Sequence, residues 1–462
     1  MSILRRFRPI LERGPLLLAL AISVIVATGG GVQPTTAGHE DWPENGIICT
    51  SNATSTFTLV TQTGYISQPD GNAVFMWGLS ESGQPFQHPS PILCVNEGKT
   101  VTIVVKNTLP DNISLVFPGQ ENVLANGAPS QPQWDASGNL VSLAPEAEAN
   151  GGSVTYSFVA ESPGTYLYES GTEPLKQVNM GLFGAIIVRP TGYDPGLGHA
   201  YAYTGESSRY NPATEYILLL SEIDPMLHMA VEQGLPYNMN NYVPRYWLMN
   251  GRSFPDTIAP NGAVWLPNQP YGSLIHIHPK DVNPYLDASG TPTTTVTTDA
   301  NPAYNPEPAL IRYLSVGSED YPHHPHGNHE RIIARDGNEL VATAPYTDDL
   351  SYERFTIVVG PGQTMDATFY WEDVDKWDPN ENPIPVTIPQ LQNLVFGTFY
   401  SGSPYLGNED QLPVGTQVLN QCGEYYHIAH NHALHQITAW GVVLSGHITF
   451  ARIDPPLPNS CP

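Results

Sequence analysis

Two short stretches of this chain are crowded with histidine, and each contains a His-x-His. The first pair is His324 and His326, and the second is His430 and His432. On a β-strand, residues i and i+2 project to the same face about 6.5–7 Å apart, so two such pairs on neighbouring strands can bring their imidazoles together. Neutral imidazole is a ligand for copper, zinc, iron and nickel. The pattern therefore predicts a metal site made by these histidines.

Other histidines are weaker candidates. His427 precedes His430 by three positions, and a period of two places it on the opposite face of the strand. Three neighbours are expected at the rim of the site or hydrogen-bonded to its ligands: His323, His329 and His435. A third His-x-His, His276 and His278, has no partner pair nearby in the sequence. We expect the scattered histidines to lie on the surface: His39, His88, His199 and His228.

The composition of the chain indicates the fold class that positions these residues. The chain has 462 residues, enough for more than one domain, and its Gly 41 and Pro 45 punctuate recurring Val/Ile/Thr/Tyr runs. This pattern predicts an all-β protein. The formal net charge is −26, which argues against nucleic acid or an anionic membrane surface as a partner, because both bind basic patches.

The first thirty residues differ from the rest. Arg5, Arg6, Arg8 and Arg13 precede or flank the start of an apolar run at 15–27. A basic segment followed by about a dozen apolar residues is typical of an export signal, and it is short for a membrane span of about 20 residues. We expect residues 1–30 to direct export, to the periplasm, the cell surface or the medium. A retained N-terminal anchor is the alternative, and no later stretch is apolar enough to span a bilayer.

The cysteines agree with an exported protein. There are 4, and they can form two disulfides in three different pairings among Cys49, Cys94, Cys422 and Cys461. No Cys-x-x-Cys is present, which argues against a c-type haem or a zinc ribbon.

One plan occurs twice along the chain. A hydrophobic strand leads into a turn that ends in glycine, a Gly-x-Tyr strand enters a polar loop, and an apolar strand closes the unit. Such strands with Gly/Pro corners favour a Greek-key sandwich or barrel. We predict two such domains, at 45–190 and 213–455, joined by a linker at 191–212.

Three sequence motifs of the first unit are specific enough to indicate a protein family. Glu97-Gly-Lys-Thr-Val-Thr-Ile103, Pro163-Gly-Thr-Tyr-Leu-Tyr168 and Gly181-Leu-Phe-Gly-Ala-Ile-Ile-Val188 resemble the first domain of multicopper oxidases. The resemblance implies cupredoxin-like domains and copper as the cofactor. In that family, four His-x-His pairs from two domains hold a three-copper cluster, and one Cys and two His hold a separate type 1 copper.

Half of the cluster ligands, and none of the type 1 ligands, are carried over to this sequence. The first domain has Val116-Phe-Pro-Gly119 and Glu169-Ser-Gly171 where the family has His-x-His pairs. The type 1 ligand positions fall on Tyr321, Asn431 and Gln436. The second domain keeps both of its pairs. Because reduction of oxygen to water needs four electrons, we do not expect this chain to perform it alone.

Two hypotheses follow. The first is an exported protein that binds one or two copper ions through its second domain, with an oxidase activity that is degenerate or depends on a partner. That partner would be a second copy or another envelope protein that supplies missing ligands. The second is a metal-free structural or interaction module on a cupredoxin scaffold. Metal analysis of the purified protein separates the two.

Overall fold

The computed structural model describes residues 43–197, 200–281, 306–327, 329–342, 348–373, 387–392, 417–419 and 425–454. The predicted export segment, His39, His199, Cys422 and Cys461 lie outside the described residues. Residues Trp42–Pro462 form one compact unit. Among the described residues, no helix is long and apolar enough to cross a membrane.

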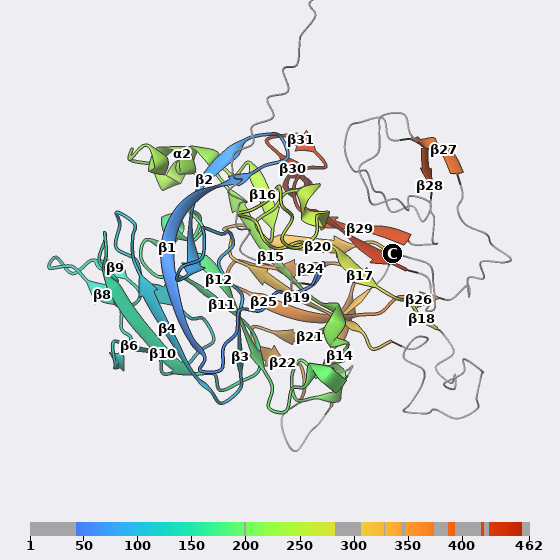
Figure 1. Cartoon of the computed structure of the whole chain (residues 1–462), viewed down its shortest axis with the longest axis horizontal. Helices are drawn as coiled ribbons and strands as arrows, with labels where there is room; N and C mark the ends of the chain where they lie inside the picture. The colour runs from blue at the N-terminus through green and yellow to red at the C-terminus, as the bar shows by residue number, and fades with distance from the viewer. Residues whose placement is uncertain are drawn as a thin grey trace, which may run out of the picture. The chain divides into compact units, whose positions relative to one another are not determined.

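The first half of the unit contains two facing sheets (Figure 1). The larger sheet has six strands in the order β2 (Ala73–Glu81), β1 (Thr56–Ser67), β4 (Thr100–Lys106), β10 (Ser153–Val159), β6 (Leu124–Ala125) and β7 (Ala128–Pro129). The smaller sheet has four, in the order β3 (Leu93–Asn96), β12 (Phe183–Arg189), β11 (Gly164–Ser170) and β5 (Leu115–Val116). Short hairpins flank them: β8 (Gln133–Trp134) with β9 (Leu140–Ser142), and β13 (Ala200–Tyr201) with β14 (Arg209–Tyr210).

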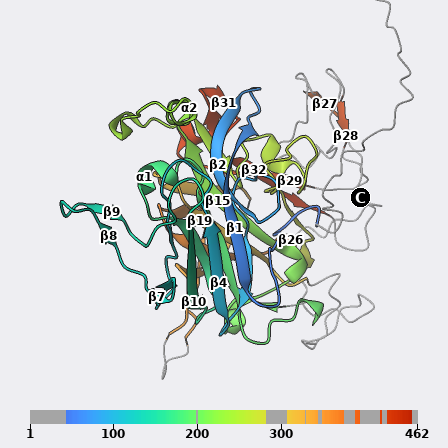
Figure 2. The ribbon, with the colours of Figure 1, turned by 60° about the vertical axis from the view of Figure 1, so that its left-hand side comes forward.

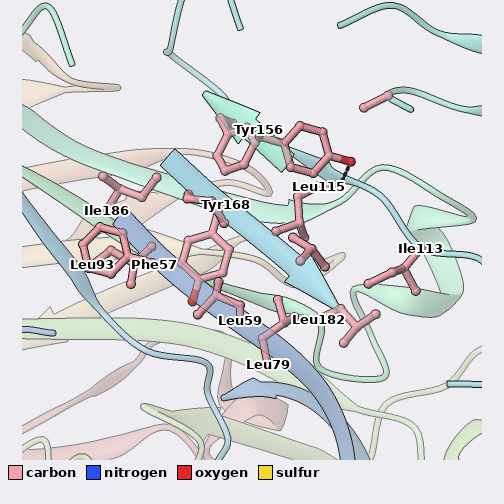
Figure 3. Packing of buried hydrophobic residues seen from close by; sticks show 14 of the residues in the cluster. Phe57, Leu59, Leu79, Leu93, Ile113, Leu115, Tyr156, Tyr168, Leu182 and Ile186 are labelled. Atoms are coloured by element: carbon pink, nitrogen blue, oxygen red, sulfur yellow. Dashed lines mark hydrogen bonds between the residues drawn. The ribbon is translucent and has the colours of Figure 1, made fainter. Parts of the chain in front are cut away.

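Alternation of side chains explains how the larger sheet packs. In β4, buried Val101, Ile103 and Val105 alternate with residues that are exposed or half-buried. Figure 2 shows β1, β4 and β10 running side by side, as their pairing requires. Between the sheets, the rings of Tyr156 and Tyr168 pack among aliphatic side chains (Figure 3). Burial of this apolar surface is the main stabilising term of such a sandwich.

The second half repeats the arrangement. One sheet has the order β16 (Tyr246–Met249), β15 (Glu215–Ile223), β19 (Ala309–Ser315), β25 (Thr364–Phe369), β21 (Glu330–Arg335) and β22 (Asn338–Glu339), and β23 (Tyr352–Arg354) also pairs with β21. The other has the order β17 (Ile275–Ile277), β32 (Ile448–Ile453), β29 (Tyr425–Asn431), β20 (Tyr321–Pro325) and β24 (Ile357–Val359). Smaller pairs are β18 (Lys280–Asp281) with β26 (Glu372–Asp373), β27 (Thr387–Gln392) with β28 (Gln417–Leu419), and β30 (Thr438–Ala439) with β31 (Val442–Val443).

The all-β prediction is confirmed. In the described residues, α-helix is limited to α1 (Pro174–Gln177) and α2 (Pro225–Glu232). The division at 45–190 and 213–455 stays a prediction. The segment 191–212, expected as a linker, contains the β13–β14 hairpin, and its Tyr203 and Tyr210 are buried.

A buried ionic network joins the strands of the two halves. The Arg312 Nε atom in β19 donates to Glu215 Oε1 at 2.6 Å, and its Nη1 atom donates to Asp366 Oδ2 at 3.2 Å and to Thr165 Oγ1 in β11 at 2.8 Å. Arg189 in β12 donates to the same Glu215 oxygen at 2.6 Å. The two guanidinium groups balance the two carboxylates, so the network is neutral as a whole. Burial alone would raise the pKa of Glu215, but the two guanidiniums outweigh burial and lower it to about 2.

One disulfide lies within the described residues. Cys49 and Cys94 are bonded with their Cα atoms 5.4 Å apart, which ties the segment before β1 to β3. Only one of the three pairings left open by the sequence contains this bond.

Candidate metal centre

Strands β20 and β29 bring the two His-x-His pairs together. They pair antiparallel, and His324 lies directly opposite His430 in their register. Because directly opposed residues project to the same face, both pairs point to one side of the sheet. The centroid of the His324 ring lies 4.9 Å from that of His326, 5.7 Å from that of His430 and 5.0 Å from that of His432. The four predicted residues therefore form one cluster, which we call the histidine quartet.

The closest approach in the quartet is between His326 Nε2 and His430 Nε2, at 3.1 Å. Two nitrogens that each lie about 2.0–2.1 Å from one ion are roughly 2.9–3.4 Å apart at common ligand angles. This pair therefore fits one shared ion. Within the part of the chain that the structure describes, no three or more His, Cys, Asp or Glu side chains are arranged to hold an ion at once.

Hydrogen bonds orient two of the imidazoles. His324 Nδ1 lies 2.7 Å from the carbonyl oxygen of Phe355 and 2.9 Å from Oγ1 of Thr356. His430 Nδ1 lies 2.8 Å from the carbonyl oxygen of Asn431. Because a carbonyl oxygen only accepts, each Nδ1 carries the proton and each Nε2 keeps its lone pair. This is the usual arrangement of histidines that bind metals.

Burial favours the neutral imidazole at two positions of the quartet, His326 and His430. Burial lowers the pKa of His326, and the neighbouring His430, His324 and His432 lower it further. Burial also lowers the pKa of His430. His326 and His432 are exposed, and His324 and His430 are half-buried, so the quartet lies at the protein surface. Neutral imidazole is the form that binds metal.

Glycine shapes the turn after the first pair. Gly327 has a φ of +83°, a region that L side chains rarely adopt. A Cβ there would lie 2.8 Å from the ring of Trp371 and 2.9 Å from His427 Nδ1. Its counterpart Gly119 also has a φ of +83°. The repeated glycine turn in the sequence is therefore a backbone requirement of both halves.

The remaining described histidines near the quartet in sequence, and His276, make other contacts. His427 packs on Trp371, with ring centroids 4.2 Å apart, and burial lowers its pKa to about 4. His323 is fully buried against Tyr313, so it is not at the rim. His435 is exposed, with Nε2 3.3 Å from Glu319 Oε2. His276 Nε2 lies 2.6 Å from Asp454 Oδ2.

The surface prediction for two scattered histidines was wrong. His88 and His228 are each only 1% exposed. His228 Nδ1 lies 2.6 Å from the carbonyl oxygen of Phe75, and His88 packs edge-on against Phe183. Their sequence neighbours alone did not indicate this, because the strands that cover them are distant in sequence.

The positions equivalent to type 1 copper ligands also converge, around a buried histidine that no sequence pattern indicated. Asn431 Nδ2 donates to Gln436 Oε1 at 3.0 Å and also contacts His447 Nδ1. The Tyr321 ring lies 4.9 Å from that of His447, and its hydroxyl donates to Glu222. A hydrogen-bonded polar network without a thiolate fills this place. His447 lies in the segment Gly446-His-Ile-Thr-Phe450, where no second histidine stands at the spacing of a metal-binding pair.

The first half places the matching segments side by side without histidine. Val116 in β5 lies opposite Glu169 in β11, in the same antiparallel relation as the quartet strands. Burial raises the pKa of Glu169. An apolar side chain and a carboxylate replace imidazoles here, so this place does not reproduce the histidine quartet.

Comparison with known proteins gives matches to multicopper oxidases. Residues 85–192 match a family model described as multicopper oxidase. A laccase, abr2, from Aspergillus fumigatus is 34% identical over 107 residues, which are 22% of this chain and 16% of that protein. The multicopper oxidase VdtB from Byssochlamys spectabilis is 31% identical over 144 residues, which are 30% of this chain and 19% of that protein.

Solved structures give similar matches. The multicopper oxidase mgLAC has a TM-score of 0.49 at 17% identity, with 87% of this chain and 86% of that chain covered. A blue copper oxidase from Nitrosomonas europaea has a TM-score of 0.47 at 17% identity, with 87% of this chain and 85% of that chain covered. The family match therefore shows that residues 85–192 are similar to a multicopper oxidase domain.

Proposed function

We propose that this protein is an exported copper-binding protein whose metal site is the histidine quartet. The observation that carries the proposal is the register of β20 and β29, which puts His324 opposite His430 and both His-x-His pairs on one face. The 3.1 Å separation of His326 Nε2 and His430 Nε2 supports a shared ion. The export segment predicted from residues 1–30 is part of the proposal.

The residues of this chain would hold and orient the ion. The carbonyl oxygens of Phe355 and Asn431 keep the Nδ1 protons of His324 and His430, which leaves their Nε2 atoms to bind. Because His430 Nε2 keeps its lone pair, His326 Nε2 is the donor in their 3.1 Å hydrogen bond. That proton would have to move to Nδ1 of His326 before Nε2 could bind the ion. Copper bound there would supply one-electron redox chemistry. With first-half positions such as Val116 and Glu169 lacking imidazole, we propose that oxidase activity is degenerate or needs a partner that contributes ligands.

The metal-free module is the second candidate. It is favoured by the absence, among the described residues, of three or more donors already arranged around one point. In that case the four imidazoles would be a surface feature of a structural or interaction protein.

The test is copper binding by the His324→Ala/His430→Ala double variant. We expect the unaltered protein to bind one or two copper ions and to gain about 2.7 kcal/mol of stability at a free copper concentration 100 times Kd. The double variant should lose both the bound copper, measured by equilibrium dialysis, and the rise in melting temperature.

The His276→Ala/His278→Ala double variant is the matched control, because it removes the other described His-x-His. It should retain the copper content of the unaltered protein. Equal copper binding by the quartet variant and the unaltered protein would favour the metal-free module.

We also predict that the copper-loaded protein has no blue colour. An intense visible charge-transfer band requires a thiolate beside imidazoles, and the position between His430 and His432 is Asn431. Absorption spectra should contain only weak d–d bands. An intense band near the usual blue-copper position would mean that a cysteine ligand exists elsewhere.

A further inference from the structure

The β30–β31 hairpin presents a run of apolar side chains to solvent. Trp440 and Gly441 form the two-residue turn between its strands. Figure 1 shows the hairpin beside β16, which β30 contacts. Four large side chains at the turn and just after it are more than half exposed: Trp440 at 51%, Val442 at 55%, Val443 at 71% and Leu444 at 53%. Together they form an apolar patch, which we call the hairpin tip.

The backbone of the hairpin tip adopts conformations that its residues disfavour. Trp440 has a φ of +50° and Gly441 a φ of +82°, so both turn residues are left-handed, as in a type I′ hairpin turn. Asn-Gly is the favoured pair in such a turn, because asparagine and glycine tolerate this conformation. Leu444 also has a positive φ, of +56°. Large apolar residues at positions that disfavour them indicate a role outside folding.

Hydrogen bonds hold the hairpin tip in one conformation. Ala439 at its base is 1% exposed, and its N–H donates to Ser445 Oγ at 2.8 Å. The same hydroxyl donates to the carbonyl oxygen of Val442 at 2.5 Å. The N–H of Trp440 donates to the carbonyl oxygen of Arg245 at 2.6 Å. A surface that is ordered in advance loses little conformational entropy when it binds.

The charges around the hairpin tip suit a neutral surface that carries phosphate groups. Residues 436–446 contain no charged side chain. The guanidinium carbon of Arg245 lies 5.9 Å from the centre of the Trp440 ring. This arginine is exposed, and no carboxylate in the described part of the chain forms an ion pair with it. A free guanidinium beside an apolar tip matches a phospholipid, whose phosphate lies next to its acyl chains.

We propose that the hairpin tip inserts into the surface of a zwitterionic phospholipid bilayer. The side chains of Val442, Val443 and Leu444 enter the boundary between headgroups and acyl chains. Trp440 lies at the level of the headgroups, where an aromatic ring with one polar end is favoured. Arg245 pairs with a lipid phosphate. This binding is independent of copper, so its test and the test of the proposed function can fail separately.

Size and charge favour lipid over a protein partner. A standard protein–protein interface uses about 20–30 residues from each side, whereas the hairpin tip offers four large side chains. A second copy and an anionic lipid would both bring negative charge toward a chain whose formal net charge is −26. A neutral bilayer takes up a few apolar side chains without that repulsion.

Binding of the full chain to phosphatidylcholine vesicles tests the proposal, with co-sedimentation and tryptophan emission as readouts. We expect saturable binding and emission shifted to shorter wavelength. The lipid concentration at half-binding should rise at least about 10-fold in Val443→Asp, which puts a charge in the inserted surface. Val264→Asp is the matched control, because Val264 is 83% exposed and lies outside the hairpin. It should bind as the unaltered protein does.

Trp440→Asn separates lipid binding from folding. Asparagine suits the left-handed turn better than tryptophan, so the melting temperature should stay the same or rise. The lipid concentration at half-binding should nevertheless rise about 3- to 10-fold, because the aromatic ring is lost. A lower melting temperature with unchanged lipid binding would assign Trp440 to folding and count against the proposal.

Three other results would overturn the proposal. The first is the absence of binding to phosphatidylcholine vesicles by the unaltered protein. The second is equal binding by Val443→Asp and the unaltered protein. The third is a dimer in lipid-free solution, measured by light scattering, that Val443→Asp converts to a monomer. The hairpin tip would then be an interface between two copies of the chain.

Discussion

Replacing Arg312 by methionine is expected to lower the free energy of unfolding by about 3–5 kcal/mol. Arg312 is fully buried and hydrogen-bonds to Glu215, Asp366 and Thr165. Without its guanidinium, the two buried carboxylates share only Arg189, so one negative charge stays without compensation in a medium of low dielectric constant. Urea unfolding followed by tryptophan fluorescence measures the change.

Arg331→Met is the matched control for this prediction. Arg331 also pairs with an acid, Asp349, but its side chain is 47% exposed and that of Asp349 is 39% exposed. Solvent screens such a pair, so its loss should cost no more than about 1 kcal/mol. Similar costs for the two variants would show that the buried network contributes nothing beyond a surface ion pair.

The second large effect is a loss of stability below about pH 6.5. Burial is the main cause that lowers the pKa of His88 to about 3 and of His228 and His447 to about 4. Since these values lie below the usual value of about 6.5, the unfolded chain binds protons that the folded chain does not. Stability should therefore fall as pH falls from about 6.5 toward 4, by about 1.4 kcal/mol per pH unit for each such histidine.

Two buried acids act in the opposite direction. Burial raises the pKa of Glu222 and Glu330 to about 7, so the folded chain keeps protons that the unfolded chain releases above about pH 4.5. Between about pH 4.5 and 6.5, each acid therefore cancels the contribution of one histidine to the pH dependence of the free energy of unfolding. Three histidines against two acids leave a net loss of stability of about 1.4 kcal/mol for each unit by which the pH falls. His323 and His427 add to this loss, because their pKa values are lowered to about 3 and about 4.

His88→Phe tests this account, because it keeps a ring against Phe183 and removes a titrating group. The free energy of unfolding, measured at several pH values between 4.5 and 6.5, should depend on pH less steeply by about 1.4 kcal/mol per unit. A misfit of the larger ring would displace the whole curve without changing its slope. An unchanged slope would mean that His88 is protonated in the folded protein or does not titrate in this window.

The sequence alone is sufficient for the fold class and for the members of the quartet. A period of two is a local property of strands, so the sequence places His324 and His326 on one face, and it does the same for His430 and His432. The glycine after His326 and the alternating apolar residues of β4 are equally local signals. Each depends only on the residues within a few positions along the chain.

Tertiary structure decides which of these faces meet and what surrounds them. The register that sets His324 opposite His430 depends on hydrogen bonds between strands about 100 positions apart, and the burial of His88 and His228 depends on covering strands distant in sequence. The same is true of His447 beside Asn431 and of the network around Arg312. Burial and charge compensation are sums over neighbours in space, and a local pattern of residues contains no information about those neighbours.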